Sequence, residues 1–226
     1  MLTLTVEKDS LVDVQVQKLP EHEIVYRRLR EMILCGELEP GQAVTIQGLI
    51  ASLGAGMTPV REAIRRLTAE GALDFMGNRR VSVPVLRLNQ INEIAFARLA
   101  LEPELAFQAT GRATPDDIAL LENIDAEVNR SIARGDVRGY LMQNHLFHST
   151  LYAISGSKIL ISLADALWLR MGPSLRVMGG RFGTTTLPDR HIDTISGLRT
   201  GDAAAVREAI RADIAQGIEQ IRLSFG

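Results

Sequence analysis

Two short amphipathic segments joined by a glycine-containing turn constrain the fold of this chain more than any other feature. In residues 46–53 the apolar side chains recur at the spacing of one helix face, and Thr45 is a residue type that caps helices. Thr58 and Pro59 are a start signal for a second helix, because the hydroxyl can hold free amides and the proline needs no partner. The apolar residues of this second helix share one face: Val60, Ala63, Ile64 and Leu67. The pattern predicts a helix, a tight turn and a helix.

The outer face of the second predicted helix is cationic. Arg61 and Arg65 project from it, with Thr58 and Arg66 nearby. A short helix of this kind fits the major groove of DNA, where its side chains reach base edges and phosphates. A helical hairpin that merely presents a solvated charged face would show the same residues, so this segment alone leaves both interpretations open.

The flanking segments complete a small domain. Residues 72–75 and 81–85 are predicted as two short strands, the second with the alternation typical of a half-buried strand. Arg79 and Arg80 lie at the tip between these strands, and residues 20–35 form an amphipathic helical pattern before the hairpin. Three helices and a β-hairpin wing are the elements of a winged helix-turn-helix, which favours DNA binding.

Two long ordered motifs run through this predicted domain. They are VYxxLRxxIxxGxLxPG in residues 25–41 and TPVREAIRRLxxEG in residues 58–71. In both motifs the chain resembles the GntR family of bacterial transcription regulators. The sequence after the wing resembles the all-helical effector domain of the FadR branch of that family, so the resemblance extends over about residues 18–223.

The resemblance implies a mainly α-helical chain in three parts. These are an N-terminal arm (residues 1–17), a winged helix-turn-helix DNA-binding domain (residues 18–86) and a helical effector-binding and dimerisation domain (residues 87–226). It also implies a homodimer on a near-palindromic DNA operator, since two-fold protein symmetry is mirrored in the half-sites. Among such regulators, repression released by a small organic acid is the commoner mode.

The DNA-binding segment departs from its relatives at two places. Many members have a serine and an arginine where this chain has Gly56 and Met57, and Arg-Gly where it has Arg79 and Arg80. Because the missing arginine commonly contacts a guanine, we expect the preferred operator to differ from the commonest one of the family. We expect Arg61 to contact base edges, and Arg65 bases or phosphate. The expected backbone contacts come from Thr58, Arg79 and Arg80, and Arg66 lies beside this set.

The second domain carries a candidate metal site. In the related effector domains, an aspartate and a histidine one turn apart and a histidine on each of two later helices hold a divalent metal. The matching residues here are Asn144, His148, His191 and Asp213, so an asparagine replaces the aspartate and an aspartate replaces the last histidine. Two imidazoles, a carboxylate and an amide oxygen form a mixed shell suited to Zn²⁺, Ni²⁺ or Mn²⁺, although the neutral amide is a weaker donor. The alternative is a hydrogen-bonded buried cluster without metal. His145, one residue along from Asn144, is expected to face outward.

Arg98 is the candidate effector-binding residue. It lies on an otherwise apolar predicted helix, and in the related domains an arginine at this place meets the carboxylate of the ligand beside the metal. A guanidinium binds a carboxylate through two parallel hydrogen bonds. The alternative is an internal ion pair with Glu102, one turn further, or with Asp213.

Two other classes of protein are compatible with some of these residues. His148, His191 and Asp213 would also suit a metalloenzyme, but no separate general base or nucleophile accompanies them, so we do not expect an enzyme. A regulator whose second domain only dimerises is the other alternative.

The lone Cys35 excludes an internal disulfide and favours a reducing cytoplasm, and no apolar run approaches the length that crosses a membrane. The net charge of −2 means that DNA affinity must depend on the placement of charges and on pairing two copies.

Overall fold

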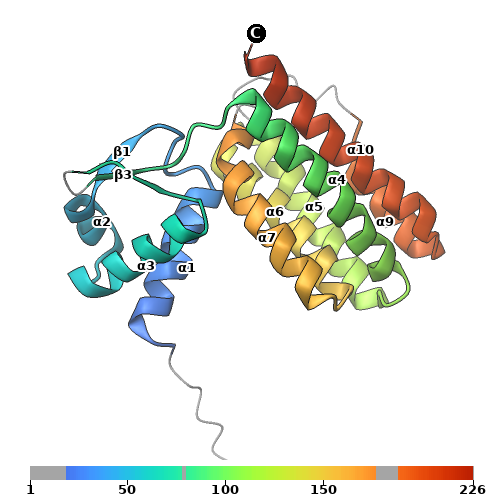
Figure 1. Cartoon of the computed structure of the whole chain (residues 1–226). Helices are drawn as coiled ribbons and strands as arrows, with labels where there is room; N and C mark the ends of the chain where they lie inside the picture. The colour runs from blue at the N-terminus through green and yellow to red at the C-terminus, as the bar shows by residue number, and fades with distance from the viewer. Residues whose placement is uncertain (1–18, 78–79, 177–187, 226) are drawn as a thin grey trace, which may run out of the picture.

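The computed structural model describes residues 19–77, 80–176 and 188–225. The N-terminal arm, residues 1–17, and the wing residue Arg79 lie outside this range. The chain is mainly helical, with a small N-terminal unit of helices and short strands beside a larger helical bundle (Figure 1). This arrangement confirms the fold class expected from the sequence.

The N-terminal unit is a winged helix-turn-helix. Its helices are α1 (Glu21–Leu34), α2 (Ile46–Leu53) and α3 (Met57–Ala69). Its strands are β1 (Ala43–Thr45), β2 (Asp74–Phe75) and β3 (Arg80–Ser82), which form an antiparallel sheet in the order β1-β3-β2. Val81 in the central strand pairs with Val44 on one side and Phe75 on the other. Strand β1 was not predicted, because three residues are too few to show a periodic pattern.

The two helix starts of the hairpin differ from one another. Thr45 caps α2 as predicted, since its Oγ1 accepts a hydrogen bond of 2.9 Å from the Gly48 amide. The predicted cap at Thr58 is wrong: α3 begins at Met57, and its N-cap is Gly56, which lies two residues before Thr58 and has no side chain to accept a bond. Pro59 thus lies in the first turn of α3, where the amides have no partner within the helix and a missing N–H costs little.

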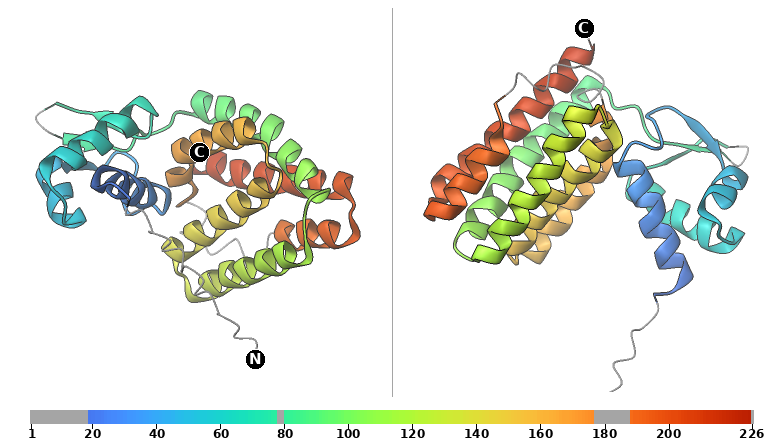
Figure 2. Two further views of the ribbon diagram at one scale, coloured as in Figure 1. Left: turned by 90° about the horizontal axis from the view of Figure 1, so that it is seen from below. Right: turned by 180° about the vertical axis from the view of Figure 1, so that it is seen from behind.

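The C-terminal bundle consists of long antiparallel helices. They are α4 (Leu88–Thr110), α5 (Pro115–Arg134), α6 (Val137–Ile154), α7 (Lys158–Met171), α9 (Arg190–Thr200) and α10 (Ala203–Arg222), with short 3₁₀ turns η1 (Gly172–Leu175) and η3 (Leu223–Phe225). Side-chain caps define the starts of several helices, as with Thr114 for α5 and Asp202 for α10. Helix α10 packs on α4 and α9, and α5 packs on α6 (Figure 2). Among the described helices, none combines the length and apolar character needed to span a membrane.

Arginines of the bundle fasten the winged helix to it. Arg170, at the end of α7, donates from Nε to the carbonyl oxygen of Glu70 at the end of α3, over 3.0 Å. Arg176, just after η1, donates to the carbonyl oxygen of Gly36, at the end of α1. Cations are favoured at helix C-termini, where free carbonyl groups concentrate negative charge. The end of α7 and η1 therefore hold the C-terminal ends of two helices of the DNA-binding unit.

Candidate functional site

The exposed face of α3 carries the predicted DNA-contacting residues. Thr58, Arg61 and Arg65 are all exposed. Arg65 forms an ion pair of 2.7 Å with Glu62 one turn back, whereas Arg61 forms no ion pair with any residue in the described ranges. Arg80 is exposed on β3, beside the wing tip. This surface is cationic and accessible, as contact with DNA requires.

Arg66 has a different environment from Arg61 and Arg65. Its guanidinium lies 3.5 Å from the centre of the Tyr26 ring, and it forms ion pairs of 3.0 Å with Glu23 and 3.2 Å with Glu70. Tyr26 in turn donates to Glu70 over 2.8 Å. These contacts tie α3 to α1, so the structure gives Arg66 a part in holding the recognition helix, and a contact with DNA stays a prediction for it.

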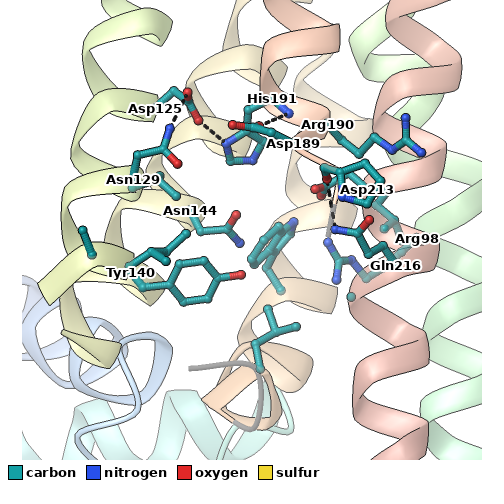
Figure 3. Close-up of a pocket in the computed structure, with 18 residues that line it drawn as sticks. Arg98, Asp125, Asn129, Tyr140, Asn144, Asp189, Arg190, His191, Asp213 and Gln216 are labelled. Atoms are coloured by element: carbon teal, nitrogen blue, oxygen red, sulfur yellow. Dashed lines mark hydrogen bonds and ion pairs between the residues drawn. The ribbon is translucent and has the colours of Figure 1, made fainter. Parts of the chain in front are cut away.

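A pocket of about 430 Å³ opens in the bundle (Figure 3). Its walls come from all six α-helices of the bundle, and the 3₁₀ turn η1 contributes Leu175. The polar side chains among its lining residues are Arg98, Asp125, Asn129, Tyr140, Asn144, Asp189, Arg190, His191, Asp213 and Gln216. Three of the four predicted metal ligands and the predicted effector-binding arginine therefore border one pocket.

The four predicted metal ligands lie at this pocket or directly beside it. Asn144 and His148 project from α6, His191 lies on α9 and Asp213 on α10. His148, His191 and Asp213 each offer one ligand atom, and these atoms lie within 4.8 Å of one another. His148 Nε2 is 3.1 Å from Asp213 Oδ2, and Asn144 is buried and points into the pocket. The structure thus assembles the residues that the resemblance implied.

The two histidines differ in their electrostatic environment. Burial lowers the pKa of His148, because the charged imidazolium loses its solvation. Burial also disfavours the charged form of His191, but the hydrogen bond from Nδ1 to Asp125, 2.8 Å long, and the nearby negative charges of Asp213, Asp125 and Asp189 together outweigh it and raise the pKa of His191. The His191 ring is further held by stacking on Phe147, with ring centres 3.8 Å apart.

Arg98 is buried and already paired. Its Nε and Nη2 donate to the two oxygens of Glu102 over 2.5 and 3.0 Å, the internal ion pair that was the alternative to ligand binding. Glu102 also accepts hydrogen bonds from Tyr152, over 2.7 Å, and from Trp168, over 3.1 Å. Burial disfavours the Arg98 cation, yet the Glu102 carboxylate outweighs this effect and raises the pKa of Arg98. Arg98 is therefore charged, and a ligand in the pocket would meet it together with Glu102.

The expectation that His145 faces outward is wrong. Its ring lies edge-on against Trp168, with centres 5.2 Å apart, and its Nε2 is buried without a hydrogen-bond partner among the described residues. Burial lowers the pKa of His145 to about 3, so the ring is neutral. It faces inward because α1 and α7 cover this side of α6, which the sequence of α6 alone does not show.

Several site residues were not predicted. Asp125 on α5 forms the hydrogen bond to His191, and Tyr152 lies one turn after His148 on α6 and contacts its Nδ1 over 2.9 Å. A signal for Asp125 existed, because it falls on the same helix face as the apolar residues Leu121, Ile124 and Val128. A carboxylate on a buried face needs a partner. Tyr152 gave no such signal, since a tyrosine on an apolar face is usually part of the core.

Comparison with known proteins identifies the family. The profile described as "Bacterial regulatory proteins, gntR family" matches residues 22–83, and that of the FCD domain matches residues 93–216. The chain belongs to the GntR family of DNA-binding transcription regulators, in the group with a C-terminal FCD domain.

Individual relatives agree with this class. The chain is 30% identical over 192 residues to the HTH-type transcriptional regulator McbR of Escherichia coli K12, covering 85% of this chain and 86% of McbR. It is 24% identical over 210 residues to the HTH-type transcriptional repressor RspR of the same organism, covering 90% of this chain and 91% of RspR. The solved structure of E. coli McbR/YncC superposes with a TM-score of 0.85 at 26% identity, over 92% of this chain and all of that one. These relatives are transcription regulators and not enzymes.

Proposed function

We propose that this regulator is a homodimeric repressor that a small organic acid releases from its operator. The observation that carries the proposal is that the pocket and the DNA-binding unit share a structural segment. Trp168 and Leu175 line the pocket, while Arg170 and Arg176, which follow them closely in the chain, bond to the ends of α3 and α1. A ligand that moves the end of α7 or η1 would therefore shift the recognition helix.

Such a ligand changes DNA binding only if it prefers one arrangement of the two units over the other. The repressor assignment is supported by the relative RspR, which is an HTH-type transcriptional repressor. The operator is expected to be near-palindromic, because a two-fold symmetric dimer presents two copies of α3.

A divalent metal in the pocket is the second part of the proposal. His148 Nε2 is buried without a hydrogen bond among the described groups, although Asp213 Oδ2 is only 3.1 Å away. Two ligand atoms that each lie about 2.0–2.1 Å from a tetrahedral metal are separated by roughly 3.3 Å, so this spacing fits a shared ion. His148, His191 and Asp213 would hold Zn²⁺, Ni²⁺ or Mn²⁺, with Asn144 supplying an amide oxygen. A bound metal would act as a Lewis acid that attracts an anionic ligand.

Metal binding should stabilise the folded chain. At a Zn²⁺ concentration of 100 times the dissociation constant, we expect a gain of about 2.7 kcal/mol, visible as a rise in Tm that a chelator reverses. His148→Ala should abolish the rise, because one imidazole ligand is lost. His22→Ala, which removes an exposed histidine of α1, is the matched control and should keep it. An unchanged Tm of the wild-type protein on adding Zn²⁺, Ni²⁺ and Mn²⁺ in turn would refute the metal site.

Arg98 remains the proposed contact for the carboxylate of the effector. Because Glu102 already occupies two of its donors, the acid would either use the remaining Nη1, which now points to the Met171 sulfur at 3.6 Å, or replace Glu102. In both cases Met171 and Trp168, at the end of α7, would have to adjust.

An apolar surface on the bundle is the proposed dimer interface. Phe96 on α4 and Ile159 on α7 are 78% and 79% exposed, Leu163 on α7 is half exposed, and α4 and α7 pack side by side. Large exposed apolar side chains on two adjacent helices are candidates for an interaction surface. We expect Phe96→Glu to convert the dimer to a monomer in sedimentation equilibrium at micromolar concentration. Leu120→Glu, on the outer face of α5, should leave the dimer intact; a dimeric Phe96→Glu protein would place the interface elsewhere.

Binding to DNA tests the proposed function as a whole. Purified protein should bind labelled DNA from upstream of its own gene in the presence of excess random DNA, and candidate acids with metal should release it. Release by an acid that also binds the isolated protein would support an effector-controlled repressor. Specific binding that no acid or metal alters would instead favour a second domain that only dimerises.

A further inference from the structure

The hydroxyl of Tyr152 connects two buried groups beside the pocket, Glu102 and His148, and has only one proton to donate. Its oxygen lies 2.7 Å from Glu102 Oε2 and 2.9 Å from His148 Nδ1. Glu102 is fully buried and accepts two hydrogen bonds from the Arg98 guanidinium, so it is an ionised carboxylate that can only accept. The proton of Tyr152 therefore points to Glu102.

This assignment determines which nitrogen of His148 carries a proton. Because the Tyr152 hydroxyl donates to Glu102, its oxygen can only accept from His148, and the neutral imidazole must carry its proton on Nδ1. Nε2 then has a free lone pair, and this is the buried atom that lacks a hydrogen bond and lies 3.1 Å from Asp213 Oδ2. Two acceptor atoms at this distance repel one another unless a cation lies between them.

His191 is arranged in the same way by a different residue. Its Nδ1 lies 2.8 Å from Asp125 Oδ1, and the other oxygen of Asp125 accepts a hydrogen bond of 3.1 Å from Asn129 Nδ2. Asp125 is buried, and the stacked Phe147 ring prevents the imidazole from turning. Since the carboxylate only accepts, the Nδ1 of His191 carries a proton, and Nε2 is the atom left to bind a metal.

We propose that Tyr152 and Asp125 are positioning residues for the metal ligands His148 and His191, respectively. Each holds a proton on Nδ1 of its histidine and thereby leaves the Nε2 lone pair for the metal. Partners of this kind orient ligating histidines in metal sites generally, and their loss typically weakens metal binding 10- to 100-fold. The inference rests on the proposed metal site. It adds two residues that are not themselves ligands, and it links the site through Glu102 to Arg98.

The first test reads the tautomer directly. Long-range ¹H–¹⁵N spectra of the full-length, metal-free protein with labelled histidine distinguish a protonated Nδ1 from a protonated Nε2. We expect His148 in the wild-type protein to be protonated on Nδ1, and Tyr152→Phe to shift its population toward protonated Nε2. A wild-type His148 protonated on Nε2 would overturn the inference, whatever the protein does with metals.

The second test measures Zn²⁺ affinity by competition with a chromogenic chelator. Tyr152→Phe and Asp125→Ala should each bind Zn²⁺ about 10- to 100-fold more weakly than wild type. Asp125→Asn should recover part of the loss, because its amide oxygen still accepts from Nδ1. The control is Tyr26→Phe, which removes a hydrogen bond of 2.8 Å from a tyrosine to Glu70, in the winged helix. Its affinity should match that of wild type.

The possible failures are distinguishable. A wild-type protein that binds no Zn²⁺, Ni²⁺ or Mn²⁺ refutes the metal site and the inference with it. A wild-type protein that binds Zn²⁺, together with Tyr152→Phe and Asp125→Ala variants of equal affinity, refutes the inference alone.

Discussion

Replacing Arg61 with alanine is expected to weaken binding to the specific operator by about 1–3 kcal/mol, which is roughly 5- to 150-fold, and to relax base preference at the contacted position. The reason is that Arg61 is exposed on the outer face of α3 and forms no ion pair with another described residue, so its donors are available to a base edge. Fluorescence anisotropy with labelled operator and a set of single-base variants would measure both effects.

One variant serves as the control for Arg61→Ala. Arg130→Ala removes an exposed arginine of α5 that pairs with Glu127, and thereby makes the same change in net charge far from the DNA-binding face. Its operator affinity should equal that of wild type. If Arg61→Ala also bound the operator as tightly as wild type, α3 would not contact DNA through the face assigned to it.

Replacing Glu102 with glutamine should have the largest effect on stability, a loss of about 3–5 kcal/mol in the free energy of unfolding. Glu102 is fully buried and neutralises the buried Arg98 cation, while it also accepts hydrogen bonds from Tyr152 and Trp168. The neutral amide leaves the guanidinium without a counter-charge. Urea denaturation monitored by circular dichroism would give the difference.

Two further proteins separate charge burial from other causes of the Glu102→Gln effect. Glu127→Gln breaks an ion pair of the same kind, between residues exposed on α5, and should unfold like wild type. The double variant Arg98→Met with Glu102→Leu should recover much of the lost stability, because an apolar pair of similar volume carries no desolvation cost. A double variant less stable than Glu102→Gln would show that hydrogen bonding to Glu102, and not the unpaired cation, dominates.

The parts of the fold that follow from local pattern were predictable from the sequence. The cap at Thr45 and the apolar face of α3 depend on residues a few positions apart, and the structure confirms them. Strand β1 was missed, and so was the true start of α3, because Gly56 caps that helix without a side-chain signal.

The candidate site could be predicted only in part, for a physical reason. The spacing of Asn144 and His148 on one helix face is a local property, and the resemblance supplied His191 and Asp213. The partners of these residues come from other helices: Asp125 reaches His191 across 66 positions of sequence, and Glu102 reaches Tyr152 across 50. The position of Arg66 on α3 could be predicted from the local sequence pattern. Its ion pair with Glu23 could not, because it depends on how α1 packs against α3.

Trp168 is the only tryptophan in the chain, and it lies at the wall of the pocket. Its ring is 4.3 Å from the Arg98 guanidinium and its centre is 5.1 Å from that of His148, while its Nε1 donates to Glu102. The intrinsic tryptophan fluorescence of this protein therefore originates entirely from the pocket. An acid that displaces Glu102 would alter the emission spectrum, and paramagnetic Ni²⁺ bound beside the indole would quench it, so unlabelled protein can be titrated optically with candidate ligands.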